Sequence, residues 1–311
     1  MTTKNRLRTM VIVNPASAAG ATGQRWEQIA VLIRDAVGPF EHAFTAGPLH
    51  ATSLSNPALR DGFEMIVAVG GDGTLNEVLC GFFQGGRAVS PAAVLGIVPQ
   101  GTGSDFARTL GATSLEDACA QLGGSESRPI DVGHAVFTDH DGKTVERVFL
   151  NVASFGCSGQ IARILSPTLK RASGSLAFTL ATVRSLLFYQ DQIITITLDD
   201  ESAHEYSVTS CAVCNGQYFG GGMYVAPHAL VDDARFDLTL WSGFGLLDFI
   251  SKRRSIYNGA HIHEAGTRLF RAGKVTATSP SRVLLELDGE SVGRLPARFT
   301  LLQRSLRLKV R

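Results

Sequence analysis

The sequence predicts two domains of different architecture, an α/β domain with a parallel sheet followed by an antiparallel β-domain. Before about Asp131, short apolar runs without polar alternation are separated by stretches of helical spacing, which is typical of a parallel sheet covered on both faces. After that point, short runs tend to alternate with period two, which is typical of antiparallel strands with one solvated face. A chain of 311 residues is long enough for both domains.

The first domain is expected to begin with a short buried strand at Thr9–Asn14 (TMVIVN). Apolar residues then repeat at helical spacing over residues 26–37, which predicts a covering helix. Two more buried strands, Met65–Val69 and Val94–Val98, each run into a glycine-rich loop, and helical spacing resumes over residues 75–82. Ligands of such sheets bind beyond the carboxyl ends of the strands, so both loops lie at the expected binding edge.

The second domain is expected to contain several short strands. The candidate strands are Val148–Ala153, Ile193–Leu198, Tyr206–Val213, Phe236–Trp241, Val283–Leu287 and Leu306–Val310. Two helical insertions are expected, at about Ser175–Tyr189 and Gly245–Tyr257. Cys211 and Cys214 form a CxxC inside a predicted strand, where they point to opposite faces and belong to the core.

Composition narrows the class of protein. Hydrophobic residues make up 44% of the chain and charged residues 18%, as in a well-packed domain. Residues 1–135 hold 9 basic against 12 acidic residues, a balance of −3, and residues 251–311 hold 13 against 4, a balance of +9. The basic end suits an anionic surface, either membrane or nucleic acid, or is a set of solvated strand faces. We expect His261 and His263 to lie on the surface, because no third metal ligand is evident nearby.

The expected cellular location is the cytoplasm. No apolar stretch approaches the roughly 20 residues that a membrane helix needs. The first eight residues lack the apolar region of a signal peptide, and five scattered cysteines suggest a reducing compartment.

The first glycine-rich loop, Val69–Glu77 (VGGDGTLNE), has the chemistry of a phosphate-binding loop. Its glycines allow backbone N–H groups to approach a phosphate closely. Thr74 and Glu77 have capping-box spacing, which predicts that a helix begins at Thr74 with its positive end facing the loop. Asp72, an acid among anion-binding donors, is explained by a bridging Mg²⁺. The alternative is a tight strand-to-helix turn in which Asp72 is a local cap.

The second glycine-rich loop, Pro99–Ala107 (PQGTGSDFA), repeats this chemistry before a helix expected from about Ser104. Two such loops on neighbouring strand ends can face one ligand. Neither loop is a Walker motif, and Asn76 stands where a dinucleotide fingerprint needs its third glycine.

Together these motifs resemble the catalytic-domain signature of the diacylglycerol kinase family, which includes sphingosine and ceramide kinases and is related to NAD kinases. The signature segments are GGDGTLNEV at 70–78 and VPQGTGSDFA at 98–107. Matching segments elsewhere are Asn14-Pro15, Thr45 with 50–52, the second-domain run from Asn215 to Asp233, and 287–290 (LDGE). The resemblance therefore covers most of the chain.

The resemblance implies a fold and its boundaries. Residues 1–132 would form an α/β nucleotide-binding domain like that of NAD kinases, and residues 133–299 a β-sandwich domain for the lipid substrate. The last residues, about 300–311, would return to the first domain.

The resemblance also implies a set of residues that bind ATP. They are Asn14, Thr45, Gly70, Gly71, Asp72, Gly73, Thr74, Leu75, Asn76, Gly101, Thr102 and Asp105. Asp72 would also bind or organise the catalytic Mg²⁺, supported by Asp105 and Asp131.

The late acidic motif would supply the general base, for which we favour Asp288 and place Glu290 second. Asp288-Gly289 between apolar runs is also a hairpin-turn signal, and a turn can present its acids to a site. A structural Mg²⁺ would be bound by Asp233 and by the backbone carbonyls of Leu230 and Arg235. At that site the usual glycine of the family is replaced by Ala234.

The function implied is an ATP-dependent lipid kinase, most simply one that converts diacylglycerol to phosphatidic acid. We expect transient contact with the inner face of the membrane and no nucleic-acid partner. Sphingosine, ceramide or phosphatidylglycerol as acceptor, an NAD kinase-like activity and a non-catalytic regulator remain alternatives, and the oligomeric state is open. An apolar wall for the lipid could come from Leu176, Leu180, Val183, Leu187 and Phe188, which could equally be core.

Overall fold

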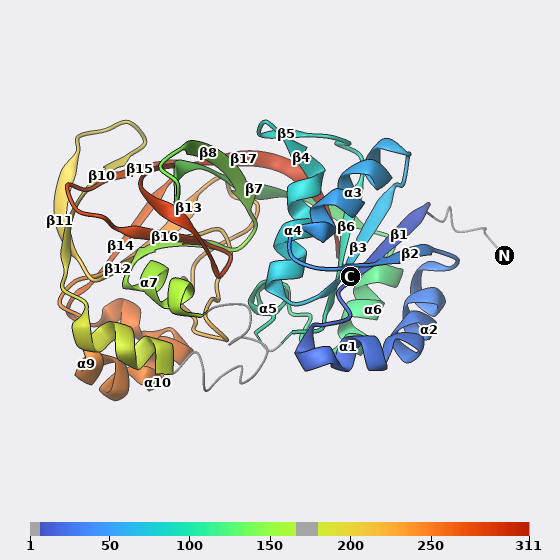
Figure 1. Cartoon of the computed structure of the whole chain (residues 1–311), viewed down its shortest axis with the longest axis horizontal. Coiled ribbons are helices and arrows are strands. Elements are labelled where there is room, and N and C mark those ends of the chain that lie inside the picture. The colour runs from blue at the N-terminus through green and yellow to red at the C-terminus, as the bar shows by residue number, and fades with distance from the viewer. Residues whose placement is uncertain (1–6, 102, 166–179, 311) are drawn as a thin grey trace. The chain divides into compact units, whose positions relative to one another are not determined.

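The computed structural model describes residues 7–101, 103–165 and 180–310, which form two compact units (Figure 1). Unit 1 contains Met1–Ile130 and Arg304–Arg311, and unit 2 contains Asp131–Gln303. No helix of the described residues is long and apolar enough to cross a membrane.

Unit 1 contains a parallel sheet with the strand order β17-β6-β3-β1-β2. Its strands are β1 (Thr9–Val13), β2 (Glu41–Phe44), β3 (Met65–Gly70), β6 (Val94–Pro99) and the end of β17 (Glu290–Lys309). The predicted parallel sheet is therefore confirmed. Every residue of β3 is buried, as expected for a strand whose two faces are both covered.

Helices lie on both faces of this sheet (Figure 1). They are α1 (Ala21–Gln24), α2 (Trp26–Val37), α3 (His50–Arg60), α4 (Asp72–Phe82), α5 (Asp105–Thr109) and α6 (Leu115–Gly123), with the short η1 (Ala18–Gly20) before α1. Ile29 and Ile33 of α2 and Leu122 of α6 pack against one face. Helices α3 and α4 contact each other and the strands β1 and β3. A small hairpin, β4 (Phe83–Gln84) with β5 (Arg87–Ala88), follows α4.

Unit 2 is built on antiparallel strands. They are most of β7 (Ser127–Asp139), β8 (Thr144–Phe149), β9 (Val152–Gly156), β10 (Gln192–Leu198), β11 (His204–Val208), β12 (Ser210–Cys214), β13 (Phe236–Trp241), β14 (Thr267–Ala272), β15 (Lys274–Thr278), β16 (Leu284–Leu287) and most of β17. Stacked phenylalanines fill the core: the rings of Phe149 and Phe236 lie 5.7 Å apart, and those of Phe155 and Phe299 lie 6.3 Å apart.

Unit 2 also contains short helices. They are α7 (Cys157–Ile164), a helix at 180–188, α9 (Leu246–Ser251), α10 (Arg253–Asn258) and the 3-10 helix η2 (Ala260–His263). Cys211 and Cys214 belong to two different core clusters, which confirms that they point to opposite faces of β12. His261 is 1% exposed and packs 5.7 Å from the Trp241 ring, so its predicted surface position was wrong.

Several predicted elements are divided in the structure. The run 148–153 is interrupted by a turn at Leu150-Asn151, and the run 206–213 is interrupted at Thr209. The second break occurs where the chain changes partners, because β11 pairs with β10 whereas β12 pairs with β9 and β13. The helix expected over 245–257 is two helices, with a break at Lys252.

The run Leu306–Val310 differs from its prediction in the direction of its pairing. It was predicted as an antiparallel strand, but it is the end of β17 and pairs in parallel with β6. Leu306 and Leu308 are buried, whereas Arg307 donates hydrogen bonds to Ser127. The alternation in the sequence therefore marks one buried face and does not report the strand direction.

Candidate functional site

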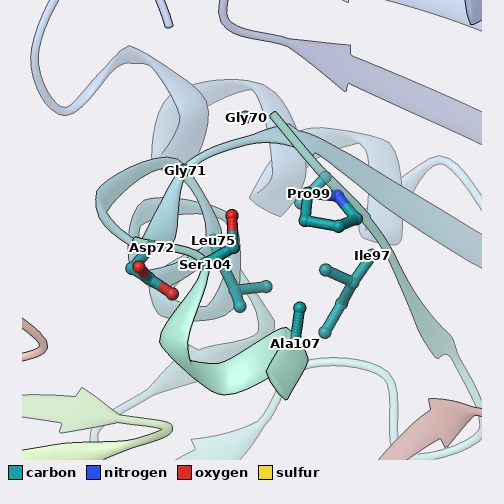
Figure 2. Close-up of a pocket in the computed structure, with 9 residues that line it drawn as sticks. Gly70, Gly71, Asp72, Leu75, Ile97, Pro99, Ser104 and Ala107 are labelled. Carbon is teal, nitrogen blue, oxygen red and sulfur yellow. The ribbon is translucent and has the colours of Figure 1, made fainter. Parts of the chain in front are cut away.

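The two glycine-rich loops of unit 1 meet where β3 and β6 end. The strands are adjacent and parallel, with Gly70 opposite Pro99, and the Gln100 N–H donates to the Gly70 carbonyl at 2.7 Å. A Cβ atom added to Gly101 would lie 2.6 Å from the Gly71 Cα, so glycine is required for this approach. Figure 2 shows Gly71 and Asp72 of one loop beside Ser104 of the other, around a small hollow.

Helix α4 begins at Asp72, two residues before the predicted start, and Gly71 is its N-cap without a side-chain hydrogen bond. The predicted capping box was therefore wrong. Thr74 lies inside the first turn and accepts a hydrogen bond from Asn14 Nδ2 at 2.9 Å, and Glu77 accepts from the Ala51 N–H. Because the first N–H groups of a helix have no intrahelical partner, the start of α4 provides donors at the loop.

Asp72 joins the two loops. Its carboxylate accepts hydrogen bonds from the Asp105 N–H at 3.2 Å and the Phe106 N–H at 3.3 Å, so it caps helix α5. Burial raises the pKa of Asp72 above 3.8, and the backbone N–H groups of Asp105, Phe106 and Ser104 oppose that rise. Asp72 is therefore a cap, but of the distant helix α5 and not of its own turn, as the local-cap alternative had it.

The surroundings of Asp72 fit a Mg²⁺ ion. Among the described residues, no lysine or arginine pairs with its carboxylate. A Cβ added to Gly103 would lie 3.2 Å from Asp72 Oδ2 and 3.6 Å from Asp105 Oδ2, so both carboxylates border the same small space. In the described part of the chain, no three His, Cys, Asp or Glu side chains form a metal cluster. Phosphate and water oxygens would therefore supply the remaining ligands, as they commonly do for Mg²⁺.

The other predicted nucleotide-binding residues fall in different places. Asn14 and Thr45 follow neighbouring strands at the same sheet edge as the loops, and the Thr45 N–H donates to the Val13 carbonyl at 2.8 Å. Thr102 lies outside the described residues. Asp131 belongs to unit 2, where its Oδ2 accepts a hydrogen bond from the Ala234 N–H at 2.7 Å.

In unit 2, Asp288 and Gly289 form the turn between β16 and β17, with φ angles of 47° and 82°. The Asp288 carboxylate accepts three backbone hydrogen bonds, from Leu150 at 2.9 Å, Asn151 at 2.9 Å and Val152 at 3.1 Å. These bonds use the N–H groups of the connection between β8 and β9 and of the first residue of β9. Asp288 therefore fastens the β16–β17 hairpin turn to the connection between β8 and β9.

Glu290 has a different environment. Its side chain is 32% exposed and pairs with Arg147 at 2.8 Å.

Sequence reasoning missed Glu286, which is buried, accepts a hydrogen bond from Ser154 Oγ and accepts another from the Gly289 N–H at 2.6 Å. The signal for Glu286 was present, because an acid at the third position of the apolar run LLEL is unusual for a buried strand.

The proposed second metal site has another arrangement. Asp233 accepts a hydrogen bond from the Arg235 N–H at 3.0 Å and forms an ion pair with Arg271. Arg271 also lies 3.4 Å from Asp237. Because Arg271 already neutralises Asp233, the residues as arranged here do not fit a Mg²⁺. The assignment of Leu230, Asp233 and Arg235 as metal ligands stays a prediction.

Comparison with known proteins accounts for both units. Residues 8–135 match the diacylglycerol kinase catalytic domain, and residues 151–310 match the YegS C-terminal NAD kinase beta sandwich-like domain. The diacylglycerol kinase of Bacillus subtilis is 28% identical over 310 residues, covering 96% of this chain and 95% of its own. The probable lipid kinase YegS of Escherichia coli is 27% identical over 255 residues, covering 81% and 80%.

The fold has solved counterparts. A diacylglycerol kinase from Bacillus anthracis aligns with a TM-score of 0.72 at 20% identity, covering 99% of this chain and 98% of its own. Yeast NADH kinase aligns with a TM-score of 0.53 at 10% identity, covering 99% and 84%, which shows a likeness of fold alone. These structures confirm an NAD kinase-like α/β domain followed by a β-sandwich-like domain. With both halves matched in order by the two domains of one family, the chain belongs to the diacylglycerol kinase family of lipid kinases.

Proposed function

We propose that this lipid kinase transfers the γ-phosphoryl group of ATP to the free hydroxyl of diacylglycerol, producing phosphatidic acid and ADP. The observation that carries the proposal is the meeting of two glycine-rich loops at Asp72, beside the N-terminus of α4. Backbone N–H groups and a carboxylate at one sheet edge suit a nucleotide triphosphate with its cation. The curated relative that matches almost the whole chain is named as a diacylglycerol kinase, which supports this acceptor.

Unit 1 would hold the phosphate donor. The N–H groups of the first turn of α4 would contact phosphate oxygens, and Asp72, with Asp105 behind it, would hold Mg²⁺. A bound Mg²⁺ supplies neutralisation of the phosphate charge. Because phosphoryl transfer has a loose transition state, the protein would catalyse it mainly by positioning the two substrates and by stabilising the charge on the transferred phosphoryl group.

Unit 2 would supply the base. As the acceptor oxygen bonds to the γ-phosphorus, the bond to the bridging β-oxygen breaks and the hydroxyl proton passes to a carboxylate. The sequence favoured Asp288 for this role, but its two oxygens accept three backbone hydrogen bonds. We therefore assign the base to Glu290, which has a partly exposed carboxylate, and we assign Asp288 to positioning of the turn.

A diacylglycerol acceptor implies work at a membrane surface, because the acyl chains keep this substrate in the bilayer. We propose peripheral and transient contact with the inner face of the membrane. The excess of basic residues in 251–311 is consistent with attraction to anionic headgroups.

The test is transfer of label from γ-labelled ATP in the presence of Mg²⁺. The purified chain is offered mixed micelles of diacylglycerol, phosphatidylglycerol, ceramide or sphingosine, with NAD in a separate reaction. Asp72→Ala and Glu290→Gln are compared with wild type, and Glu201→Gln in an exposed loop is the matched control. We expect label in phosphatidic acid, at least about 100-fold less with either site variant, and no change in the control.

Other outcomes would replace the proposal. Label in another lipid would reassign the acceptor within the same family. Label in NAD alone would indicate an NAD kinase-like activity, and ATP binding without any transfer would indicate a regulator.

A further inference from the structure

Helix 180–188 of unit 2 has three large apolar residues on its outer face. Leu180, Leu187 and Phe188 are 61%, 57% and 78% exposed. The face turned inward carries the small residues Ala181, Thr182 and Ser185, which are buried. Residues 180, 184, 187 and 188 recur at the spacing of one helix face, so the exposed leucines and phenylalanine form one stripe. A surface helix normally has the opposite arrangement, with its apolar stripe on the core.

Helix α9 presents a second exposed apolar pair. Leu247 and Ile250 are 81% and 63% exposed and lie one helical turn apart. Phe249 of the same helix packs against the core cluster that contains Trp241. The orientation of α9 is therefore fixed by Phe249, and its exposed pair is a consequence of that packing.

The two helices are anchored at one place in unit 2. Asp191 follows helix 180–188 by three residues and accepts hydrogen bonds from Thr209 Oγ1 at 2.5 Å and from the Gly243 N–H at 2.8 Å. Gly243 precedes α9, and the next N–H, of Phe244, donates to the same Thr209 oxygen at 3.0 Å. The end of one helix and the start of the other are thus held by two neighbouring side chains, and Figure 1 draws both helices at the same end of unit 2.

The charged groups around these residues are mainly cationic. Arg184 is exposed on the same stripe as Leu180 and Leu187, and Arg253 and Arg254 are exposed at the start of α10. The acid of α9, Asp248, is occupied by the Gly245 N–H and by Lys252, each at 3.0 Å. An apolar patch with exposed arginines is complementary to an anionic lipid surface, and the acids beside it, Asp191, Asp248 and Glu264, already accept hydrogen bonds or pair with Lys252.

We propose that helix 180–188 together with α9 and α10 is the membrane-docking surface of this lipid kinase. Leu180, Leu187, Phe188, Leu247 and Ile250 enter the boundary between headgroups and acyl chains, and the arginines contact lipid phosphates. This assignment rests on the proposed function, because a kinase that acts on a bilayer lipid must reach it from the surface. It revises the expected apolar wall, since Leu180, Leu187 and Phe188 face outward and Leu176 lies outside the described residues.

The first experiment measures sedimentation of the full chain with vesicles of phosphatidylcholine containing phosphatidylglycerol. A Phe188→Asp/Leu247→Asp variant is compared with Val31→Asp, which alters a 52%-exposed apolar residue on helix α2 of unit 1. We expect the double variant to lose binding by about tenfold or more and the control to bind like wild type. An Arg253→Glu/Arg254→Glu variant should bind weakly to anionic vesicles and show a reduced salt dependence.

The second experiment separates docking from catalysis. Both docking variants should phosphorylate a short-chain diacylglycerol dissolved as monomers at the wild-type rate, but a long-chain diacylglycerol in vesicles much more slowly. If wild type phosphorylates no lipid but still binds vesicles through these residues, the docking surface stands and the proposed function falls. If the variants bind vesicles like wild type, the proposal is overturned. A loss of dimers by the variants without a loss of vesicle binding would also overturn it and assign the surface to self-association.

Discussion

At the scale of the residue, Asp288 and Glu290 stand two positions apart and have different tasks. Hydrogen bonds to a charged group contribute about 1.5–3 kcal/mol each, and the Asp288 carboxylate accepts three. Glu290 has one ion pair at a partly exposed position, where such a pair contributes little to stability. In the LDGE motif, Asp288 thus stabilises the turn, and Glu290, which follows the turn, keeps a partly exposed carboxylate.

We predict that Asp288→Asn lowers the free energy of unfolding of unit 2 by about 2 kcal/mol, because its new amide group faces a backbone donor. Glu290→Gln should change that free energy by less than about 0.5 kcal/mol and abolish lipid phosphorylation. Urea unfolding followed by fluorescence measures this in a Trp26→Phe background, where Trp241 is the remaining tryptophan and reports on unit 2. Equal stability of the two variants, with activity lost only in Asp288→Asn, would return the role of base to Asp288.

We predict that His261 makes the stability of unit 2 depend on pH. Burial lowers the pKa of His261 below 6.5, so the unfolded chain binds the proton more readily than the folded chain. Below about pH 6.5 the free energy of unfolding should fall by up to about 1.4 kcal/mol per pH unit, until the folded pKa is passed. Urea unfolding between pH 5 and 8 measures the slope, which His261→Phe should reduce. His263→Phe, at an exposed position, is the control, and equal slopes in both variants would contradict the assignment.

At the scale of the element, the close approach of the two glycine-rich loops depends on backbone atoms. The Cβ position of Gly101 meets the Gly71 Cα, which no change of rotamer can move. Both loops also share Asp72, which begins α4 and caps α5. A displacement of one loop is therefore transmitted to the start of the other loop's helix.

Gly101→Ala should accordingly weaken ATP binding by about tenfold or more and destabilise unit 1 by about 1–3 kcal/mol, as overpacking does. Gly47→Ala is the matched control, because nothing lies within 4 Å of its added Cβ and its φ is not positive. Calorimetric titration with ATP and Mg²⁺ measures the affinity. Unchanged affinity in Gly101→Ala would remove these loops from the nucleotide site.

Hydrophobic periodicity located the helices and strands whose burial follows from their own local sequence. The spaced residues Ile29, Ile33 and Val37 of helix α2 are buried, as is nearly all of strands β3 and β6, so local sequence was enough to find these elements. The strand breaks at Leu150 and Thr209 were not predicted because each depends on residues far away in the sequence. The Leu150 N–H is bound by Asp288. At Thr209 the chain stops pairing with β10 and begins to pair with β9 and β13. Asp72 as an α5 cap was foreseen only as a local cap, since its partners are 33 and 34 residues away.

At the scale of the whole molecule, β17 belongs to both units. Its first residues pair with β16, Lys274–Ala277 pair with its middle, and Arg307 and Leu308 pair with β6 in unit 1. Residues 304–311 therefore complete a sheet whose other strands come from the first hundred residues. No local pattern in the chain indicates this return, which we expected only from the family resemblance.

Removal of residues 304–311 should destabilise unit 1 by more than about 3 kcal/mol, because it takes away the buried Leu306 and Leu308. The urea transition reported by Trp26 in a Trp241→Phe background should move to lower concentration, and the transition reported by Trp241 in a Trp26→Phe background should stay in place. Removal of residues 310–311 alone is the control. A shift of both transitions by the same amount would show that the two units unfold together.

The return of β17 also has a consequence for the order in which the chain can fold during synthesis. Residues 7–130 leave the ribosome first, but the edge of β6 at Val94 and Leu95 gains its partner only when residues 307 and 308 emerge. All of unit 2 is made in the interval. Until then the nascent chain carries an open β-edge, which is a site for pairing with other chains. A nascent-chain chaperone that shields this edge should therefore matter more for this protein than for one whose first sheet is contiguous in sequence.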